Sequence, residues 1–194
     1  MRKRFLIGLG AVLLAGTAIA VGSRVTSAQQ PAPPAGTAVT LTRADSVRLE
    51  GPRQPIFFRH DVHAGQLKMQ CQYCHYSVSY SSEPGIPSMQ TCMGCHMYVS
   101  GSTPTNKAEI RKLTTAWGKK QPVQWIRIHE LARHVHFPHS RHIFALGPDA
   151  CATCHGNIAR MPQVYKVNNV NNMGFCITCH IERKVTRDCS TCHY

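Results

Sequence analysis

The stretch FRHDVHAGQLKMQCQYCH, residues 58–75, joins two short patterns, F-x-H-x-x-H and C-x-x-C-H. The same two patterns recur about eighty residues later, as FPHSRH at 137–142 and CATCH at 151–155. Each copy is followed by one more C-x-x-C-H pentamer, CMGCH at 92–96 and CITCH at 176–180. The chain therefore contains an internal repeat, and each copy supplies two extra His residues and two C-x-x-C-H motifs.

A fifth pentamer, CSTCH at 189–193, follows the second copy. All ten cysteines of the chain lie in the five motifs: Cys71, Cys74, Cys92, Cys95, Cys151, Cys154, Cys176, Cys179, Cys189 and Cys192. C-x-x-C-H is the attachment signal for c-type haem, in which two thioethers hold the porphyrin edge and the His becomes the proximal iron ligand. Zinc sites, redox dithiols and a disulfide framework are the alternatives. A zinc site does not require a His directly after each Cys pair.

We therefore predict five covalently bound haems c. Their proximal iron ligands are the five His residues that end the motifs: His75, His96, His155, His180 and His193.

The two His residues of each F-x-H-x-x-H segment are candidates for distal iron ligands. At positions i and i+3 they lie on adjacent sides of one turn, so they can point at two different haems. The two segments supply four such ligands, His60, His63, His139 and His142. We expect the Phe two residues before each first His to pack on a porphyrin face. Surface histidines in a polar loop are the alternative, and the duplicated context argues against it.

The haem at CSTCH has no His pair of its own, so its distal ligand must come from elsewhere in the chain. His129 follows Trp125 and apolar neighbours, which indicate a buried segment, and we predict that His129 is this ligand. Met173 is the alternative, and a thioether ligand would raise the potential of that haem. We expect His134 and His136 at the surface or behind a ligand.

The composition favours a fold organised by cofactors. Apart from an apolar N-terminal run, the 194-residue chain is poor in aliphatic side chains and rich in Gly, Pro, Asn, Ser and His. Such a chain buries too little apolar area to offset its conformational entropy, so the haems must supply much of the core. We expect one domain of loops and short helices around five stacked haems. Residues 104–120 carry Ile110, Leu113 and Trp117 at helical spacing and predict a short amphipathic helix that ends at Gly118.

The N-terminus predicts a membrane anchor. Residues 1–4 form a basic cytoplasmic end, 5–22 a transmembrane helix, 23–55 an extended spacer and 56–194 the haem domain. A cleaved secretory signal peptide, with its cleavage site after Ala20 or near Ala28, is the alternative for the first segments. Both interpretations place the haem domain on the periplasmic side of the bacterial cytoplasmic membrane.

The formal net charge of +13 suggests an anionic partner, but the haems change this count. Each haem brings two propionates, so five haems add roughly ten negative charges that the Lys and Arg residues compensate. No basic run is interleaved with aromatic residues, and this excludes nucleic acid as a partner.

Four segments resemble the pentahaem cytochrome c subunit of alternative complex III, a bacterial quinol:electron-acceptor oxidoreductase. These are FRHDVHAG at 58–65, GIPSMQTCMGCH at 85–96, QPVQWIRIH at 121–129 and NNMGFCITCH at 171–180, in the order of that family. The segment at 130–137, with Arg133, His134 and His136, departs from the family pattern. The resemblance implies a multihaem cytochrome c fold of the class III type with one N-terminal transmembrane helix.

The resemblance also implies an electron relay without a substrate pocket of its own. The implied partners are an iron–sulfur/molybdopterin-like peripheral subunit, polytopic quinone-binding membrane subunits and a monohaem cytochrome c subunit that receives the electrons. The alternative is a membrane-anchored multihaem quinol dehydrogenase that feeds a soluble reductase. A catalytic multihaem reductase, for example of nitrite, needs an iron with an open position, often marked by a Lys in place of a motif His. All five motifs here end in His.

Overall fold

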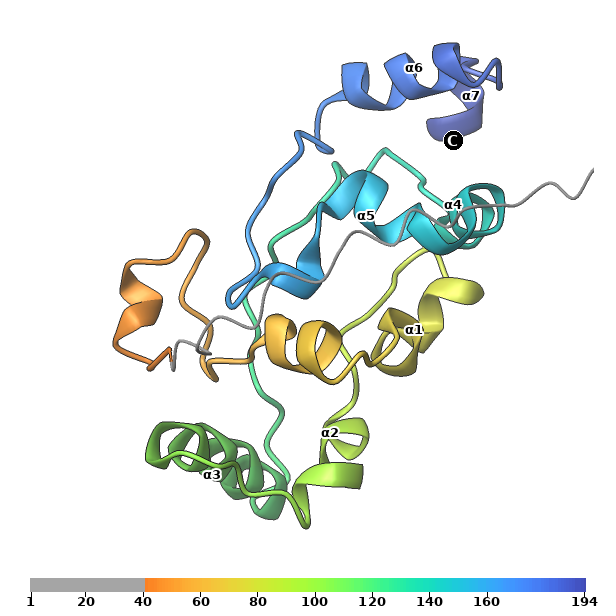
Figure 1. Ribbon diagram of the computed structural model, residues 1–194. Helices are drawn as coiled ribbons and strands as arrows, with labels where there is room; N and C mark the ends of the chain where they lie inside the picture. The colour runs from red at the N-terminus through yellow and green to blue at the C-terminus, as the bar shows by residue number, and fades with distance from the viewer. Residues whose placement is uncertain (1–40) are drawn as a thin grey trace, which may run out of the picture. The chain divides into compact units, whose positions relative to one another are not determined.

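The computed structural model describes residues 41–194, which belong to one compact unit. Within these residues the chain forms helices, turns and loops and no β-strand (Figure 1). The α-helices are α1 (Cys71–Cys74), α2 (Met89–His96), α3 (Pro104–Gly118), α4 (His139–Leu146), α5 (Ala150–His155), α6 (Met173–Glu182) and α7 (Cys189–Cys192). Four short 3-10 helices are η1 (Asp45–Val47), η3 (Tyr76–Ser79), η4 (Gly147–Asp149) and η5 (Ile158–Arg160). One π-helix is η2 (Asp61–Gln66). The predicted architecture of short helices and loops is confirmed.

Each C-x-x-C-H motif contains or ends a helix. α2 and α5 end at the His of their motifs, α6 ends two residues beyond it, and α1 and α7 consist of the C-x-x-C residues themselves. In a helical turn, residues i, i+3 and i+4 lie on one face. The two Cys side chains and the His of each motif are thereby presented together.

The predicted amphipathic helix is confirmed as α3. The Thr103 hydroxyl accepts a hydrogen bond from the Asn106 backbone N–H at 3.1 Å, and Pro104 occupies the first turn, where its missing N–H costs nothing. Leu113 is buried against Ile56 and Met93. Trp117, which we expected on the packed stripe, is 41% exposed.

The apolar core of the described residues is small. Its members are Ile56, Phe57, Val78, Met93, Leu113, Ala150 and Met161. Large side chains around the haem motifs are exposed instead, including Tyr73 within CQYCH and Tyr76 and Tyr80 after it. Exposed apolar side chains that gather at one place mark a surface built to be covered. This distribution fits a domain whose core is completed by cofactors.

The two copies of the repeat pack on each other reciprocally. η2, which follows the first F-x-H segment, packs against η5, which follows CATCH; α4 packs against η3, which follows CQYCH. Gly65 allows the first of these contacts, because a Cβ atom at this position would lie 2.3 Å from the Ala159 carbonyl oxygen. Each His pair therefore lies beside the motif of the other copy as well as its own.

Residues 41–55 are not an extended spacer, which corrects the prediction for this part of 23–55. The Gln163 side chain amide donates hydrogen bonds to the carbonyls of Ser46, Glu50 and Gly51. The Gln54 amide exchanges two 2.9 Å hydrogen bonds with the backbone of Ile126. Long-range side chain–backbone bonds of this kind satisfy the polar groups of a segment without regular structure, and they hold it on the domain.

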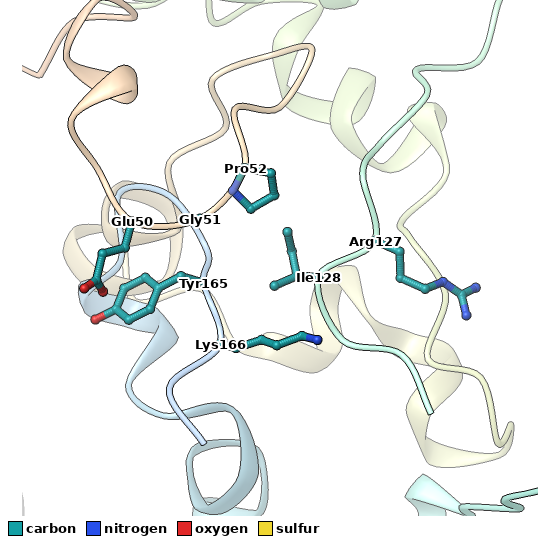
Figure 2. Close-up of a pocket in the computed structure, with 7 residues that line it drawn as sticks. All are labelled: Glu50, Gly51, Pro52, Arg127, Ile128, Tyr165 and Lys166. Atoms are coloured by element: carbon teal, nitrogen blue, oxygen red, sulfur yellow. The ribbon is translucent and has the colours of Figure 1, made fainter. Parts of the chain in front are cut away.

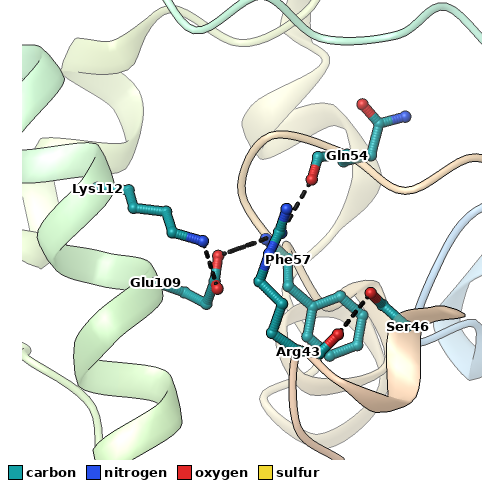
Figure 3. Close-up of polar contacts among 6 residues, drawn as sticks. All are labelled: Arg43, Ser46, Gln54, Phe57, Glu109 and Lys112. Carbon is teal, nitrogen blue, oxygen red and sulfur yellow. Dashed lines mark hydrogen bonds and ion pairs between the residues drawn. The ribbon is translucent and has the colours of Figure 1, made fainter.

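Figure 3 shows the polar contacts that join residues 41–57 to α3. The buried Glu109 carboxylate accepts a hydrogen bond from the Phe57 N–H at 2.8 Å and from the Lys112 ammonium at 2.6 Å. Arg43 lies 3.5 Å from the same carboxylate and donates to the Gln54 carbonyl at 2.9 Å. This network could not be predicted, because nothing in the sequence distinguishes Glu109 from an acidic residue on the solvated face of a helix.

We expect Glu109→Ala to lower the free energy of unfolding of the haem-loaded protein by about 2 kcal/mol, because it leaves the buried Phe57 N–H without an acceptor. Glu109→Gln keeps an acceptor oxygen and should cost less. Chemical denaturation followed by circular dichroism measures both, with the exposed Glu130→Ala as the control. Equal stability of Glu109→Ala and Glu130→Ala would contradict the role of the network.

The predicted transmembrane helix, 5–22, lies outside the described residues. Among residues 41–194, no helix has the length and hydropathy that crossing a bilayer requires.

Candidate haem sites

The two F-x-H-x-x-H segments share one side-chain arrangement. Phe58 stacks on His63, with ring centres 4.5 Å apart, and meets His60 edge-on at 4.8 Å. Phe137 stacks on His142 at 4.1 Å and meets His139 edge-on at 4.7 Å. Each Phe thus holds two imidazoles at a fixed angle. The arrangement is the same although the first segment leads into a π-helix and the second into an α-helix.

Most of the predicted iron ligands have one ring nitrogen bonded to a backbone carbonyl. The Nδ1 atoms of seven imidazoles pair with carbonyl oxygens, in His63, His75, His96, His139, His142, His180 and His193. A carbonyl oxygen only accepts, so each Nδ1 carries the proton and each Nε2 keeps its lone pair. This is the tautomer that binds a metal through Nε2, and the carbonyl fixes the ring orientation.

Two pairs of imidazoles have the spacing of a shared iron. Two imidazoles that bind one metal ion from opposite sides, with metal–nitrogen bonds of about 2 Å, have ring centres about 6 Å apart. The rings of His63 and His96 are 6.1 Å apart, and those of His142 and His180 are 6.2 Å apart. The second His of each segment therefore fits the haem of the second motif in its own copy.

The first His of each segment lies near the first motif of its copy. Burial, with smaller effects from His75 and His63, lowers the pKa of His60 to about 4. Burial, with smaller effects from His129, His139 and His75, lowers the pKa of His155 to about 4. His75 is thus one of the groups near His60, and His139 is one of the groups near His155. Both buried imidazoles are neutral at pH 7, the form that coordinates iron.

The structure does not bring the predicted fifth distal ligand to the fifth motif. The ring of His129 lies 4.4 Å from that of His155, edge-on, which leaves no room for an iron between them. Its Nε2 atom is buried without a hydrogen-bond partner. Met173, the alternative ligand, is the first residue of α6 and is exposed. The assignment of His129 to the CSTCH haem remains a prediction.

His134 supports the fifth motif from behind. The His193 Nδ1–H donates to the His134 carbonyl oxygen at 3.0 Å, and the His136 N–H donates to the Cys192 carbonyl oxygen at 2.8 Å. Because the two ring nitrogens point to opposite sides of the imidazole, the His134 backbone lies on the side of His193 that faces away from its iron. The ring of His136 stacks on Tyr194 at 4.2 Å. Both side chains are exposed, as expected for residues at the surface or behind a ligand.

Neighbouring thiols show which motifs adjoin in space. Burial, and after it the Cys95 and Cys71 thiols, raise the pKa of Cys74. Contact between the Cys71 and Cys151 thiols lowers the pKa of Cys71 to about 6 and raises that of Cys151.

The second half of the chain continues this pattern. Burial, and after it Cys179 and Cys176, raise the pKa of Cys154; burial, and after it Cys192, raise the pKa of Cys176. The motifs therefore follow one another in space as CMGCH, CQYCH, CATCH, CITCH and CSTCH. The first two are in the reverse of their sequence order, which the sequence alone did not indicate.

The residues present fit covalently attached haem. All ten cysteines are free thiols, five pairs of them each followed by a His on the same helical face. Two pairs of imidazoles have the ring spacing that a six-coordinate haem iron requires, and seven imidazoles have an Nδ1 atom held by a carbonyl oxygen. Among residues 41–194, no three His, Cys, Asp or Glu side chains gather as a metal cluster.

One pocket of about 390 Å³ lies apart from the predicted ligands. Its lining residues are Glu50, Gly51, Pro52, Arg127, Ile128, Tyr165 and Lys166. Figure 2 shows the Lys166 side chain extending toward Ile128 while the Arg127 side chain points away from the others. No predicted haem residue lines this pocket. The pKa of His129 is lowered mainly by burial and to a smaller extent by the positive charge of Lys166, which lines this pocket.

Comparison with known proteins supports the haem assignment. A multihaem cytochrome c subunit of a menaquinone reductase from Nitratidesulfovibrio vulgaris is 33% identical over 102 residues, which are 53% of this chain and 45% of the relative. The chain thus matches about half of the length of that curated relative. Residues 37–130 match the model of the Class III cytochrome C family. This segment is therefore similar to the class III cytochromes c, multihaem electron-transfer proteins that bind haem c covalently.

Proposed function

We propose that the chain is an electron relay of five c-type haems in a membrane-bound quinone-dependent oxidoreductase. The observation that carries this proposal is the continuous row of five motifs, in which each adjoins the next through its cysteines. When bound, each haem supplies one-electron exchange between Fe(III) and Fe(II). Cysteines of successive motifs lie near one another, so the proposed relay needs no diffusing carrier between its haems.

The chain adjusts the redox properties of the haems through the imidazoles that bind their irons. Carbonyl oxygens on Nδ1 raise the basicity of the ligating nitrogen and fix its direction. We assign His63 and His142 as the distal ligands at CMGCH and CITCH, and His60 and His139 as those at CQYCH and CATCH. Two imidazoles per iron favour low-spin iron that changes oxidation state with little rearrangement.

The proposed partners are an iron–sulfur peripheral subunit, polytopic quinone-binding subunits and a monohaem cytochrome c, with the haem domain on the periplasmic side of the cytoplasmic membrane. The resemblance to alternative complex III supports electron flow from quinol toward the monohaem subunit. The matched relative is named as a subunit of a menaquinone reductase, which supports the opposite direction. Reduction of the haems by menaquinol, and of menaquinone by the pre-reduced haems, in the purified complex decides between them.

We expect the intact chain to carry five haems. Denaturing mass spectrometry should give the mass of the polypeptide plus five haems, because each motif provides both thiols and the proximal His. Five double Cys→Ser variants, one for each motif, should each lose one haem. A zinc-bearing, haem-free chain contradicts the proposal. If some of the five variants lose no haem, the chain carries correspondingly fewer than five haems.

A further inference from the structure

The CMGCH end of the row borders an uncovered pocket on α3. This pocket of about 290 Å³ lies between the residues that follow CMGCH and the N-terminal half of α3, which packs beside α2 (Figure 1). Its lining residues are His96, Met97, Tyr98, Ser100, Lys107, Ile110, Arg111 and Thr114. One of them is the predicted proximal iron ligand, so the pocket reaches the redox site directly.

The segment that follows His96 returns to the Nδ1 side of its ring. The His96 Nδ1–H donates to the Val99 carbonyl oxygen at 2.9 Å. Since Nδ1 and Nε2 point to opposite sides of the ring, residues 97–99 lie behind His96, away from its iron. Met97 is 63% exposed, Tyr98 89% and Val99 54%. These three consecutive side chains are exposed, and Met97 and Tyr98 line the pocket.

Two cations line the same pocket. Lys107 and Arg111 are four residues apart on α3 and therefore share one face of the helix. Neither takes part in an ion pair among the described residues, whereas Lys112 is paired with Glu109 at 2.6 Å. The face thus combines an apolar centre with unpaired positive charge at its rim, the arrangement of transient protein–protein interfaces.

We propose that Met97, Tyr98, Val99, Lys107 and Arg111, the α3 docking face, bind the acidic surface of an electron-transfer protein. The inference rests on the proposed relay and names the kind of partner at one of its ends. Electrons pass between this partner and the CMGCH haem, because the partner lies against the residues that hold His96. Exposed Tyr and Met favour a protein as the occupant, since such side chains are enriched at protein interfaces.

The test compares two charge-reversed variants of the haem-loaded chain. Lys107→Glu/Arg111→Glu reverses the docking face, and Lys119→Glu/Lys120→Glu makes the same charge change at the C-terminal end of α3, about 12 to 18 Å away along the helix axis. Reduced flavodoxin, an acidic flavoprotein, serves as the electron donor in stopped-flow experiments. At about 0.1 M salt the first variant should be reduced about tenfold more slowly than the wild type, and the difference should vanish at about 1 M salt. The control should stay within about twofold, because its charges lie beyond a Debye length from the face.

Each other outcome overturns the proposal. An equal slowing of both variants means that only net charge matters, and no slowing of either means that the face is not used. Weaker binding of the first variant to phosphatidylglycerol vesicles, with unchanged reduction by flavodoxin, assigns the face to a lipid surface. A shifted haem potential at an unchanged rate assigns the two cations to propionates. Haem content by mass separates these results from failure of the relay itself, which would leave the wild type without five haems.

Discussion

Removal of the haem at CQYCH should divide the relay into two parts. The variant Cys71→Ser/Cys74→Ser lacks both thioethers of the motif that lies between CMGCH and CATCH in space. In the purified complex, wild-type haems should be reduced by quinol in one connected process. The variant should show a fast phase for only one or only three of its four remaining haems, and the rest should be slower by orders of magnitude. Stopped-flow absorbance at the α band measures the two amplitudes.

The size of the fast phase also identifies the end at which electrons arrive. One fast haem places the donor at CMGCH, and three place it at CSTCH. Removal of the terminal haem far from the donor is the control, because it should leave the other four haems in a single fast phase. A variant that loses CQYCH yet reduces all four haems in one fast phase contradicts the spatial order.

Removing a haem from the middle of the domain also removes the packing contacts of that haem. A second variant therefore keeps the haem and changes only its distal ligand. His60→Met retains a distal ligand at CQYCH, but a thioether raises the potential of that haem relative to an imidazole. Electrons should then collect at this site and pass on more slowly, with haem content and fold unchanged. Redox titration and the same stopped-flow experiment report both effects.

The sequence predicted the parts of the fold that are encoded locally. Helix α3 could be predicted because its cap at Thr103, its Pro104 and its apolar spacing all lie within one segment. The C-x-x-C-H motifs and their ligating imidazoles could be assigned because this chemistry demands those residues at fixed spacing. The pairing of His63 with His96 and of His142 with His180 follows the duplicated order of the motifs.

Features that depend on distant contacts could not be predicted. The packing of 41–55 depends on side-chain amides at Gln54 and Gln163, and neither differs in sequence from a solvated glutamine. The exchange of the first two motifs in the row arises from the reciprocal packing of η2 on η5 and α4 on η3. His129 was predicted as a ligand because its segment was expected to be buried, but Ile126 is 47% exposed and Trp125, Ile128 and His129 are only partly buried. The sequence also did not indicate which motif His129 adjoins.

The reciprocal packing of the two copies also explains why so small an apolar core is sufficient for folding. Each copy contributes its Phe-held His pair to a surface shared with the other copy, so the two halves are joined where the CQYCH and CATCH motifs meet. Haem attachment in either copy therefore stabilises both. Folding and cofactor loading should be coupled, as in other small domains whose core is supplied by a cofactor.

The second large effect should come from the distal imidazole of the haem at CMGCH. We expect His63→Ala to convert one haem in five from low spin to high spin, because the ring of His63 is the one found 6.1 Å from that of His96. His142→Ala should do the same at CITCH, where the corresponding distance to His180 is 6.2 Å. Electron paramagnetic resonance of the oxidised protein counts the high-spin iron, and a new charge-transfer absorption band provides an independent measure.

The matched control is His134→Ala, which removes an imidazole that lies near a proximal His without facing its iron. Its backbone carbonyl, which holds His193, survives the substitution, so all haems should keep their spin state. His129→Ala tests the remaining assignment in the same way. If it produces one high-spin haem, His129 is a distal ligand despite its contact with His155; if it does not, its buried Nε2 only supports that ring. High-spin iron in His134→Ala, or none in His63→Ala, would show that the ring spacings do not identify the distal ligands.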